Sequence, residues 1–307
     1  MTNADRIDAA LELAVSQDGV LSRAQARDLG LDRWAVAHQV ERRRWRLYGD
    51  QGIAVHLLPL TDRARCRIAA WEAGADAVLD GSTSLTWQGL KNFDDGIHLM
   101  VPWPSTARSW QGSRVHPSRL WNREDFVVKD GLWVTRCDVA AIRAGMWARS
   151  DRAGATVMAM AVQQRLATGA AVLLEAKRLN RHKRRPLLLT VAKDIAEGAQ
   201  ALSELDFAAL CRRRGLPEPS RQKVRRGANG RVYLDVLWDD LGVVVEVEGA
   251  HHDAPENAID DSLRQNALTI SRLDVLRIPV IGLRTCPDLF LEQVEAMLRT
   301  AGWNSAA

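Results

Sequence analysis

The sequence predicts an α/β domain in the C-terminal part of the chain, in the order helix, strand, strand, helix, strand, helix (αββαβα) around a small mixed sheet. Two observations predict it: apolar residues alternate with period two across residues 232–248, and apolar stripes of helical period flank this stretch. At 307 residues the chain can hold more than one core, and we place three regions at residues 1–58, 59–195 and 196–307.

The first region is predicted to contain three short helices followed by a two-stranded hairpin. Ser22 and Asp32 are favourable N-caps for the helices that follow them, and Gly30 ends the earlier of the two. The tight link between these helices is typical of a helix-turn-helix, and the turn-rich residues 48–52 predict a wing of two strands. We therefore expect a winged helix-turn-helix.

The helix after Asp32 is predicted to expose side chains that can contact DNA. In a major groove it can offer Arg and Gln to base edges, while the arginine run that follows it contacts phosphates. The predicted DNA-binding residues are Arg33, His38, Gln39, Arg42, Arg43 and Arg44. The alternative is a small helical domain with a solvated basic end. A net charge of +4 permits a polyanionic partner without demonstrating one.

This order of elements, with Leu21-Ser-Arg-Ala-Gln-Ala-Arg-Asp-Leu-Gly30 and Arg44-Trp-Arg-Leu-Tyr48, resembles the winged-helix N-terminal domain of AbiEi-family antitoxins of type IV toxin–antitoxin systems. The layout of the middle region also resembles the remainder of such an antitoxin. In that family the segment is a scaffold without known chemistry, so the resemblance implies DNA binding by the first region alone.

The middle region is predicted to be α+β and to carry no chemistry. Residues 80–84 cap a short helix, and His98 and His116 lack ligand spacing, so both histidines are expected to be structural. The basic cluster at residues 178–185 either contacts phosphates or forms a solvated face. Helices are expected over residues 61–73, 85–90, 140–147, 153–166 and 187–199, and strands over 99–102 and 132–135.

Residues 233–252 are predicted to start with a β-hairpin that carries acids on strands that should be apolar. Alternation places Val243, Val245 and Val247 on one face and Val244, Glu246 and Glu248 on the other. A turn centred on residues 240–241 places Asp235 directly across from Glu246, with Cβ atoms about 5 Å apart.

Facing carboxylates repel each other unless a cation compensates them, and carboxylate oxygens are preferred ligands of hard divalent cations. We therefore expect Asp235 and Glu246 to bind Mg²⁺, with Mn²⁺ as the alternative ion. In the competing interpretation the glutamates line the solvent face of a half-exposed strand, and Asp235 pairs with Arg225 or Arg277.

The remaining elements of this domain are a helix capped by Ser203, a helix over residues 258–270, a strand over 275–281 and a helix over 288–300. The motifs Leu234-Asp235, Val245-Glu-Val-Glu-Gly249 with His252, and Asp261-Ser-Leu-Arg264 resemble the PD-(D/E)XK restriction-endonuclease-like superfamily. More narrowly, they resemble uncharacterised proteins related to very-short-patch-repair endonucleases.

The resemblance implies phosphodiester hydrolysis, in which a bound metal polarises the phosphate and lowers the pKa of its water. Glu204 is expected as an outer ligand, Arg264 as a stabiliser of phosphate charge, and His251 or His252 as a general base or phosphate donor. Glu248 stands where the superfamily pattern has lysine, although the narrower family also has an acid there. The expected catalytic residues are Asp235, Glu246, Glu248, His252, Arg264 and Glu204.

The sequence thus predicts a DNA-binding, divalent-metal-dependent endonuclease that acts in DNA repair, defence or a toxin–antitoxin context. The alternative is a non-enzymatic DNA-binding transcriptional regulator of the AbiEi antitoxin type with a degenerate nuclease domain. A third hypothesis is a fusion in which the N-terminal part restrains the nuclease. DNA is the expected partner, no residue pattern excludes RNA, and a homodimer is compatible with each hypothesis.

The cysteines are scattered, so the sequence predicts neither a zinc site nor a disulfide framework. The N-terminus lacks the pattern of a signal peptide, and no apolar run is long enough to span a bilayer. We therefore expect a cytoplasmic protein without a membrane partner.

Overall fold

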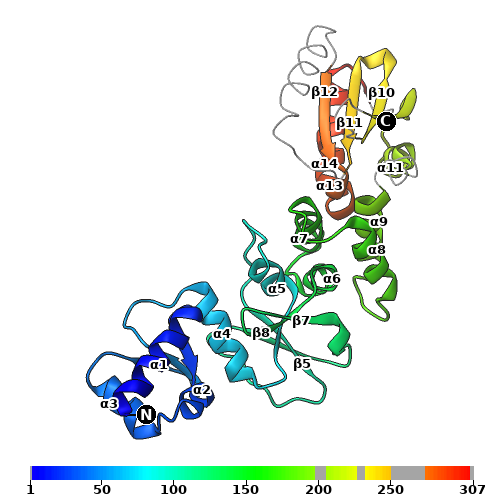
Figure 1. The fold of residues 1–307 in the computed structure, drawn as a ribbon. Coiled ribbons are helices and arrows are strands. Elements are labelled where there is room, and N and C mark those ends of the chain that lie inside the picture. The colour runs from blue at the N-terminus through cyan, green and yellow to red at the C-terminus, as the bar shows by residue number, and fades with distance from the viewer. Residues whose placement is uncertain (1, 198–204, 227–231, 250–273, 305–307) are drawn as a thin grey trace. The chain divides into compact units, whose positions relative to one another are not determined.

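The computed structural model describes residues 2–197, 205–226, 232–249 and 274–304. These residues form a mixed α/β protein with several separate sheets (Figure 1). Backbone contacts divide the chain into two compact units, Met1–Arg143 and Ala144–Ala307. The division into three regions that the sequence suggests remains a prediction.

The first part of the N-terminal unit packs helices against a small sheet with the antiparallel strand order β1-β3-β2. Ser22 and Asp32 accept hydrogen bonds from the first turns of their helices, which confirms both predicted caps. Strand β1 was not predicted, because it is only three residues long. The elements are α1 (Asn3–Ser16), β1 (Val20–Ser22), α2 (Arg23–Asp28), α3 (Arg33–Glu41), β2 (Arg46–Tyr48) and β3 (Gly52–Ala54).

The rest of this unit is built on a sheet with the order β6-β5-β4-β8-β7. Arg143 is buried between Asp80 and Asp125, at 3.0 and 2.6 Å, and so ties α6 to this layer. The elements are α4 (Asp62–Ala73), β4 (Val78–Leu79), α5 (Gly81–Trp87), β5 (His98–Pro102), β6 (Arg114–Ser118), η1 (Arg123–Asp125), β7 (Phe126–Lys129), β8 (Leu132–Thr135) and α6 (Cys137–Trp147). Strands β6 and β7 were not predicted, because β6 contains polar residues and a proline and β7 is only four residues long.

The C-terminal unit opens with helices α7 (Asp151–Gln163), α8 (Gly169–Arg178) and α9 (Arg185–Glu197). Two arginines of the basic cluster bind backbone carbonyl groups here. Arg184 donates to the carbonyl oxygens of Gly145, Met146 and Ala148, and Arg185 donates to that of Leu179 at 2.6 Å. This part of the cluster therefore caps helix ends.

The C-terminal sheet has the order β12-β11-β10-β9, with β9, β10 and β11 antiparallel and β12 parallel to β11. Its strands are β9 (Arg221–Arg226), β10 (Val232–Trp238), β11 (Val243–Glu248) and β12 (Asp274–Pro279). The helical elements around it are α11 (Phe207–Arg214), η2 (Asp239–Leu241), α13 (Val280–Thr285) and α14 (Pro287–Thr300).

Three details of this domain differ from the prediction. Helix α11 begins at Phe207 with Asp206 as its cap, not at Ser203, which lies outside the described residues. Strand β9 adds a fourth strand that the sequence did not suggest. The strand expected to reach Ile281 ends at Pro279, where α13 begins.

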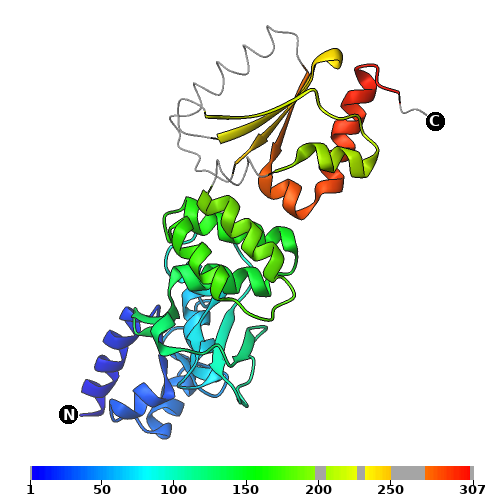
Figure 2. The same cartoon turned by 90° about the vertical axis from the view of Figure 1, so that its right-hand side faces the viewer.

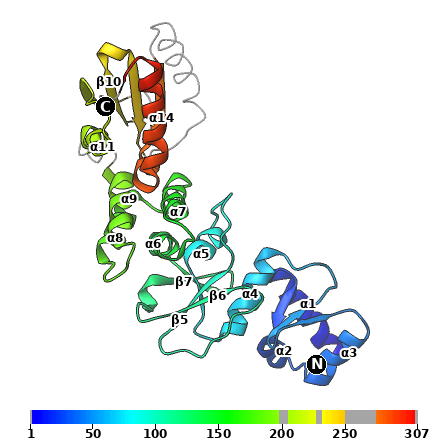
Figure 3. The same cartoon turned by 180° about the vertical axis from the view of Figure 1, so that it is seen from behind.

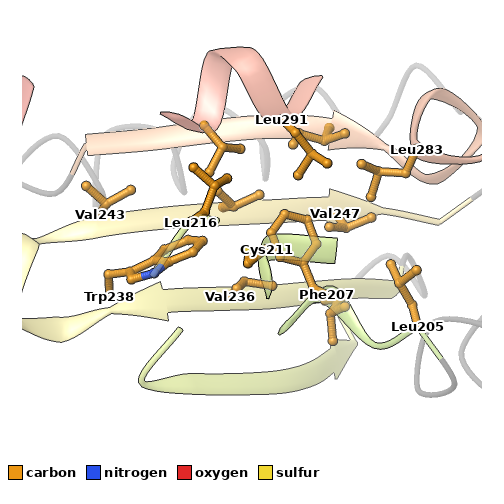
Figure 4. Packing of buried hydrophobic residues seen from close by; sticks show 14 of the residues in the cluster. Leu205, Phe207, Cys211, Leu216, Val236, Trp238, Val243, Val247, Leu283 and Leu291 are labelled. Carbon is orange, nitrogen blue, oxygen red and sulfur yellow. The ribbon is translucent and has the colours of Figure 1, made fainter. Parts of the chain in front are cut away.

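Helices α11 and α14 pack on the same face of this sheet (Figures 2 and 3). Phe207 and Cys211 from α11 meet Val236, Trp238 and Val247 from the strands in one apolar core (Figure 4). Each of these side chains is at most 3% exposed. One face of β10 and β11 is therefore the core, and the acids are on the opposite face. Within the described part of the chain, no helix has both the length and the apolar character needed to cross a membrane.

Candidate functional site

The hairpin of β10 and β11 has the register that the sequence predicts. Its turn comprises residues 239–242, and Trp238 pairs with Val243 at the ends of the strands. Gly242 adopts the left-handed conformation with φ of +65°, which glycine reaches without strain. This turn places Asp235 directly opposite Glu246, as predicted.

The face that carries the acids is not a solvent face. Glu246 is only 2% exposed, and Tyr233 and Val244 beside it are 3% and 5% exposed. Asp235 and Glu248 are half-buried. The competing interpretation, in which both glutamates line a solvent-exposed strand, is therefore wrong for Glu246.

Cations flank the two facing carboxylates on both sides. Arg277 on β12 is in register with Glu246, and its Nε lies 3.5 Å from the Glu246 Oε2. Lys223 on β9 is in register with Asp235. These four residues, Lys223, Asp235, Glu246 and Arg277, form a single row across the sheet, which we call the charged row.

Of the two arginines that the sequence proposes as partners of Asp235, Arg277 is in register with Glu246 instead, and a pairing with Arg225 stays a prediction because its side chain lies outside the described part of the chain. Arg225 is opposite Tyr233, and Arg277 approaches the other carboxylate, Glu246. A further arginine on β9, Arg221, bonds Asp239 at 2.6 Å, and its hydrogen bond lowers the pKa of Asp239.

The charges of the row decide whether the site can exist without a metal. Two carboxylates about 5 Å apart repel by about 3 kcal/mol at an effective dielectric constant of about 20, and a guanidinium at similar distance offsets a comparable amount. Arg277 is 3.5 Å from Glu246, so the hairpin can fold with the acids in place before any metal binds.

The donor set fits a hard divalent cation. Asp235 and Glu246 provide carboxylate oxygens from adjacent strands, and the burial of Glu246 restricts its carboxylate to few orientations. Among the described residues, no group of three or more His, Cys, Asp or Glu side chains is arranged to hold a metal. Asp235 and Glu246 are the facing carboxylates that would hold such an ion.

Several predicted site residues lie outside the described residues. Glu204, His251, His252 and Arg264 are among them. Their proximity to Asp235 and Glu246 remains a prediction.

Helix α3 presents a basic and aromatic face to solvent. Its exposed side chains include Arg33 and His38, and Arg42, Arg43 and Arg44, which follow the helix, are also exposed. Five of the six residues predicted to contact DNA are therefore accessible.

Gln39 is the exception, because its side chain is only 5% exposed. It lies on the same side of α3 as the buried Val36, facing the core. The prediction that Gln39 is exposed is wrong, so this side chain is not available to a base edge.

Trp34 is a candidate that the sequence pattern did not single out. It is 68% exposed and lies one helical turn before His38, with the Arg33 guanidinium 4.7 Å from its ring centroid. Arg46 in the predicted wing is also exposed. An aromatic residue next to an arginine on an exposed helix is a signal that could have identified this face.

His98 and His116 form a stacked pair in the N-terminal unit. Nδ1 of His98 lies 3.0 Å from Nε2 of His116, and the rings are nearly parallel, at 8°. Burial lowers the pKa of both, that of His116 to about 4. These contacts agree with the structural role expected for the pair.

Comparison with known proteins adds no further constraint. No family model matches the chain, and no curated protein matches it either.

Proposed function

We propose that this protein is a DNA-binding endonuclease that hydrolyses phosphodiester bonds with a divalent cation held by Asp235 and Glu246. The pairing of these two carboxylates across the hairpin, on the face opposite the core, carries the proposal. A buried acid facing a second acid is costly for folding alone, and such arrangements are concentrated at functional sites.

The architecture of the C-terminal domain supports the same proposal. A mixed sheet with three antiparallel strands and one parallel strand, with α11 and α14 packed on one face, agrees with a restriction-endonuclease-like fold. In the N-terminal unit, the element order and the strand order β1-β3-β2 agree with a winged helix-turn-helix.

The roles of the residues follow from their positions. Asp235 and Glu246 would bind Mg²⁺ or Mn²⁺, and Arg277 would hold the Glu246 carboxylate in place from the neighbouring strand. When bound, such a cation polarises a phosphate and lowers the pKa of a coordinated water. Glu248 is half-buried and lies two residues after Glu246 on the same face of β11. From that position it would assist metal binding.

Cleavage of plasmid DNA tests the proposal. The wild-type chain should nick or linearise plasmid with Mg²⁺ or Mn²⁺ and not with EDTA. Asp235→Asn and Glu246→Gln keep the side-chain shape and remove the charge, and each should slow cleavage by roughly a hundredfold or more. Asp240→Asn is the matched control, because Asp240 is an exposed acid in the turn of the same hairpin.

Calorimetric titration with Mn²⁺ separates metal binding from turnover. Wild type and Asp240→Asn should bind the ion, and Asp235→Asn and Glu246→Gln should not. Equal Mn²⁺ binding by all four proteins, or cleavage that survives in both site variants, would refute the proposed site.

A second candidate function has a specific observation in its favour. Arg277 approaches Glu246, and position 248 carries glutamate in place of lysine. Both features are compatible with a nuclease fold that no longer cleaves, in a DNA-binding regulator of the antitoxin type. Tight DNA binding without cleavage by wild type, on plain, mismatched and methylated duplexes, would favour this candidate.

A further inference from the structure

Strand β9 places a lysine at the end of the charged row. Lys223 is the antiparallel partner of Asp235, which in turn faces Glu246. Directly opposed residues point to the same face of a sheet, about 5 Å apart at Cβ. Lys223 therefore lies on the face of the two acids, one strand away from them.

Among the described side chains of the charged row, Lys223 is a cation that the fold leaves available. Arg221 bonds Asp239 at 2.6 Å, and Arg277 lies 3.5 Å from Glu246. The side chain of Lys223 is exposed, and its ammonium makes no ion pair with any described residue. Its flexible four-carbon stem allows the charge to reach over the neighbouring strand.

A protective role at a sheet edge is the simplest alternative. Strand β9 is an edge strand in the described sheet, and exposed lysines on edge strands discourage pairing with other chains. Any exposed cation on β9, including Arg221, can protect the edge strand in this way. It does not require a lysine aligned with the two carboxylates.

We propose that Lys223 binds a non-bridging oxygen of the DNA phosphate held at Asp235 and Glu246, and so supplies the positive charge that Glu248 cannot supply. This inference rests on the proposed nuclease function. The positive charge then comes from a lysine on β9, the strand before the hairpin. In the superfamily pattern the lysine is at the end of the hairpin, at the position of Glu248. Lys223 then neutralises phosphate charge without binding the metal.

The salt dependence of DNA binding tests this assignment without relying on cleavage. The probe is a short fluorescent duplex, titrated with the full chain by anisotropy at several salt concentrations, in Ca²⁺ and in EDTA. In Lys223→Met the slope of log K against log salt should become shallower by about 0.9, the value for neutralisation of a single phosphate. Lys223→Arg should keep the wild-type slope, and the exposed Lys129→Met, matched in residue type and charge, should also keep it.

Two further measurements distinguish this inference from the proposed function. Lys223→Met should bind Mn²⁺ as wild type does and should cleave plasmid roughly a hundredfold more slowly. If the wild-type protein is active and Lys223→Met has the same salt slope of DNA binding and the same cleavage rate, Lys223 has no such role. The proposed nuclease function would still stand. An inactive wild type with no Mn²⁺ binding would refute the nuclease, and a shallower slope in Lys223→Met would still support phosphate binding by this lysine.

Discussion

Glu246 is the most buried charged side chain among the predicted catalytic residues that the structure describes. It is 2% exposed, faces Asp235 across the hairpin and has Arg277 as its neighbour on the other side. A buried charge that loses its partner destabilises a fold by several kcal/mol. The stability of the metal-free protein should therefore depend on Arg277.

We expect Arg277→Met to lower the free energy of unfolding by about 2 kcal/mol without metal, below the range for fully buried pairs. The lower figure reflects the Arg277 side chain, which is 35% exposed. Saturating Mn²⁺ should restore part of the loss, because the metal replaces the missing positive charge. Urea denaturation with Mn²⁺ and with EDTA measures both values.

Arg221→Met is the control for this experiment, because Arg221 pairs with Asp239 on the exposed end of the same sheet. Its loss of unfolding free energy should be smaller than that of Arg277→Met, because an exposed ion pair contributes little to stability, and it should not respond to Mn²⁺. If Arg277→Met lowers the free energy of unfolding by the same amount with and without Mn²⁺, the two carboxylates do not bind the metal.

At the scale of elements, the hairpin turn determines whether the acids face each other. A change of one residue in register would move every side chain of β11 to the other face and would place Glu246 in the core. The turn over residues 239–242 keeps the register, and it requires a residue with positive φ at Gly242.

Gly242→Ala should therefore destabilise the domain by about 1 kcal/mol. No described atom lies within 4 Å of a Cβ added at this position, so the cost comes from the backbone conformation alone. Gly242→Asn should cost less, because asparagine tolerates the left-handed region. Urea denaturation of the three proteins measures the difference, and equal losses for Ala and Asn would show that backbone conformation is not the cause.

Strand β9 shows why one element could not be predicted. Its sequence, Arg221-Gln-Lys-Val-Arg-Arg226, is mostly basic and has a single β-branched residue, so strand propensity is weak. It becomes a strand because β10 offers hydrogen-bonding groups along its open edge. That edge exists only after the hairpin has formed, and Lys223 joins the charged row only through this pairing.

At the scale of the whole molecule, the two candidate sites lie in different compact units, with the α3 face in one and the charged row in the other. If α3 contacts DNA, its arginines should contribute to DNA affinity without affecting metal binding at the hairpin. The two functions should then be separable by mutation.

We expect the double variant Arg33→Met, Arg42→Met to bind duplex DNA more weakly, with the salt slope reduced by about 0.9 for each phosphate that is no longer neutralised. Its Mn²⁺ titration should match that of wild type. The exposed Arg108→Met, in the same unit, is the control. Wild-type affinity and slope in the double variant would show that the α3 face does not bind DNA.

The sequence by itself determined the features that depend on local chemistry. The caps at Ser22 and Asp32 and the turn that pairs Asp235 with Glu246 follow from neighbouring residues, and the structure confirms them. Tertiary structure alone decided the burial of Gln39 and the neighbours of the acids, Lys223 and Arg277. The physical reason is distance along the chain: caps and tight turns are stabilised within a few residues, whereas burial and the order of strands depend on contacts between segments far apart in sequence.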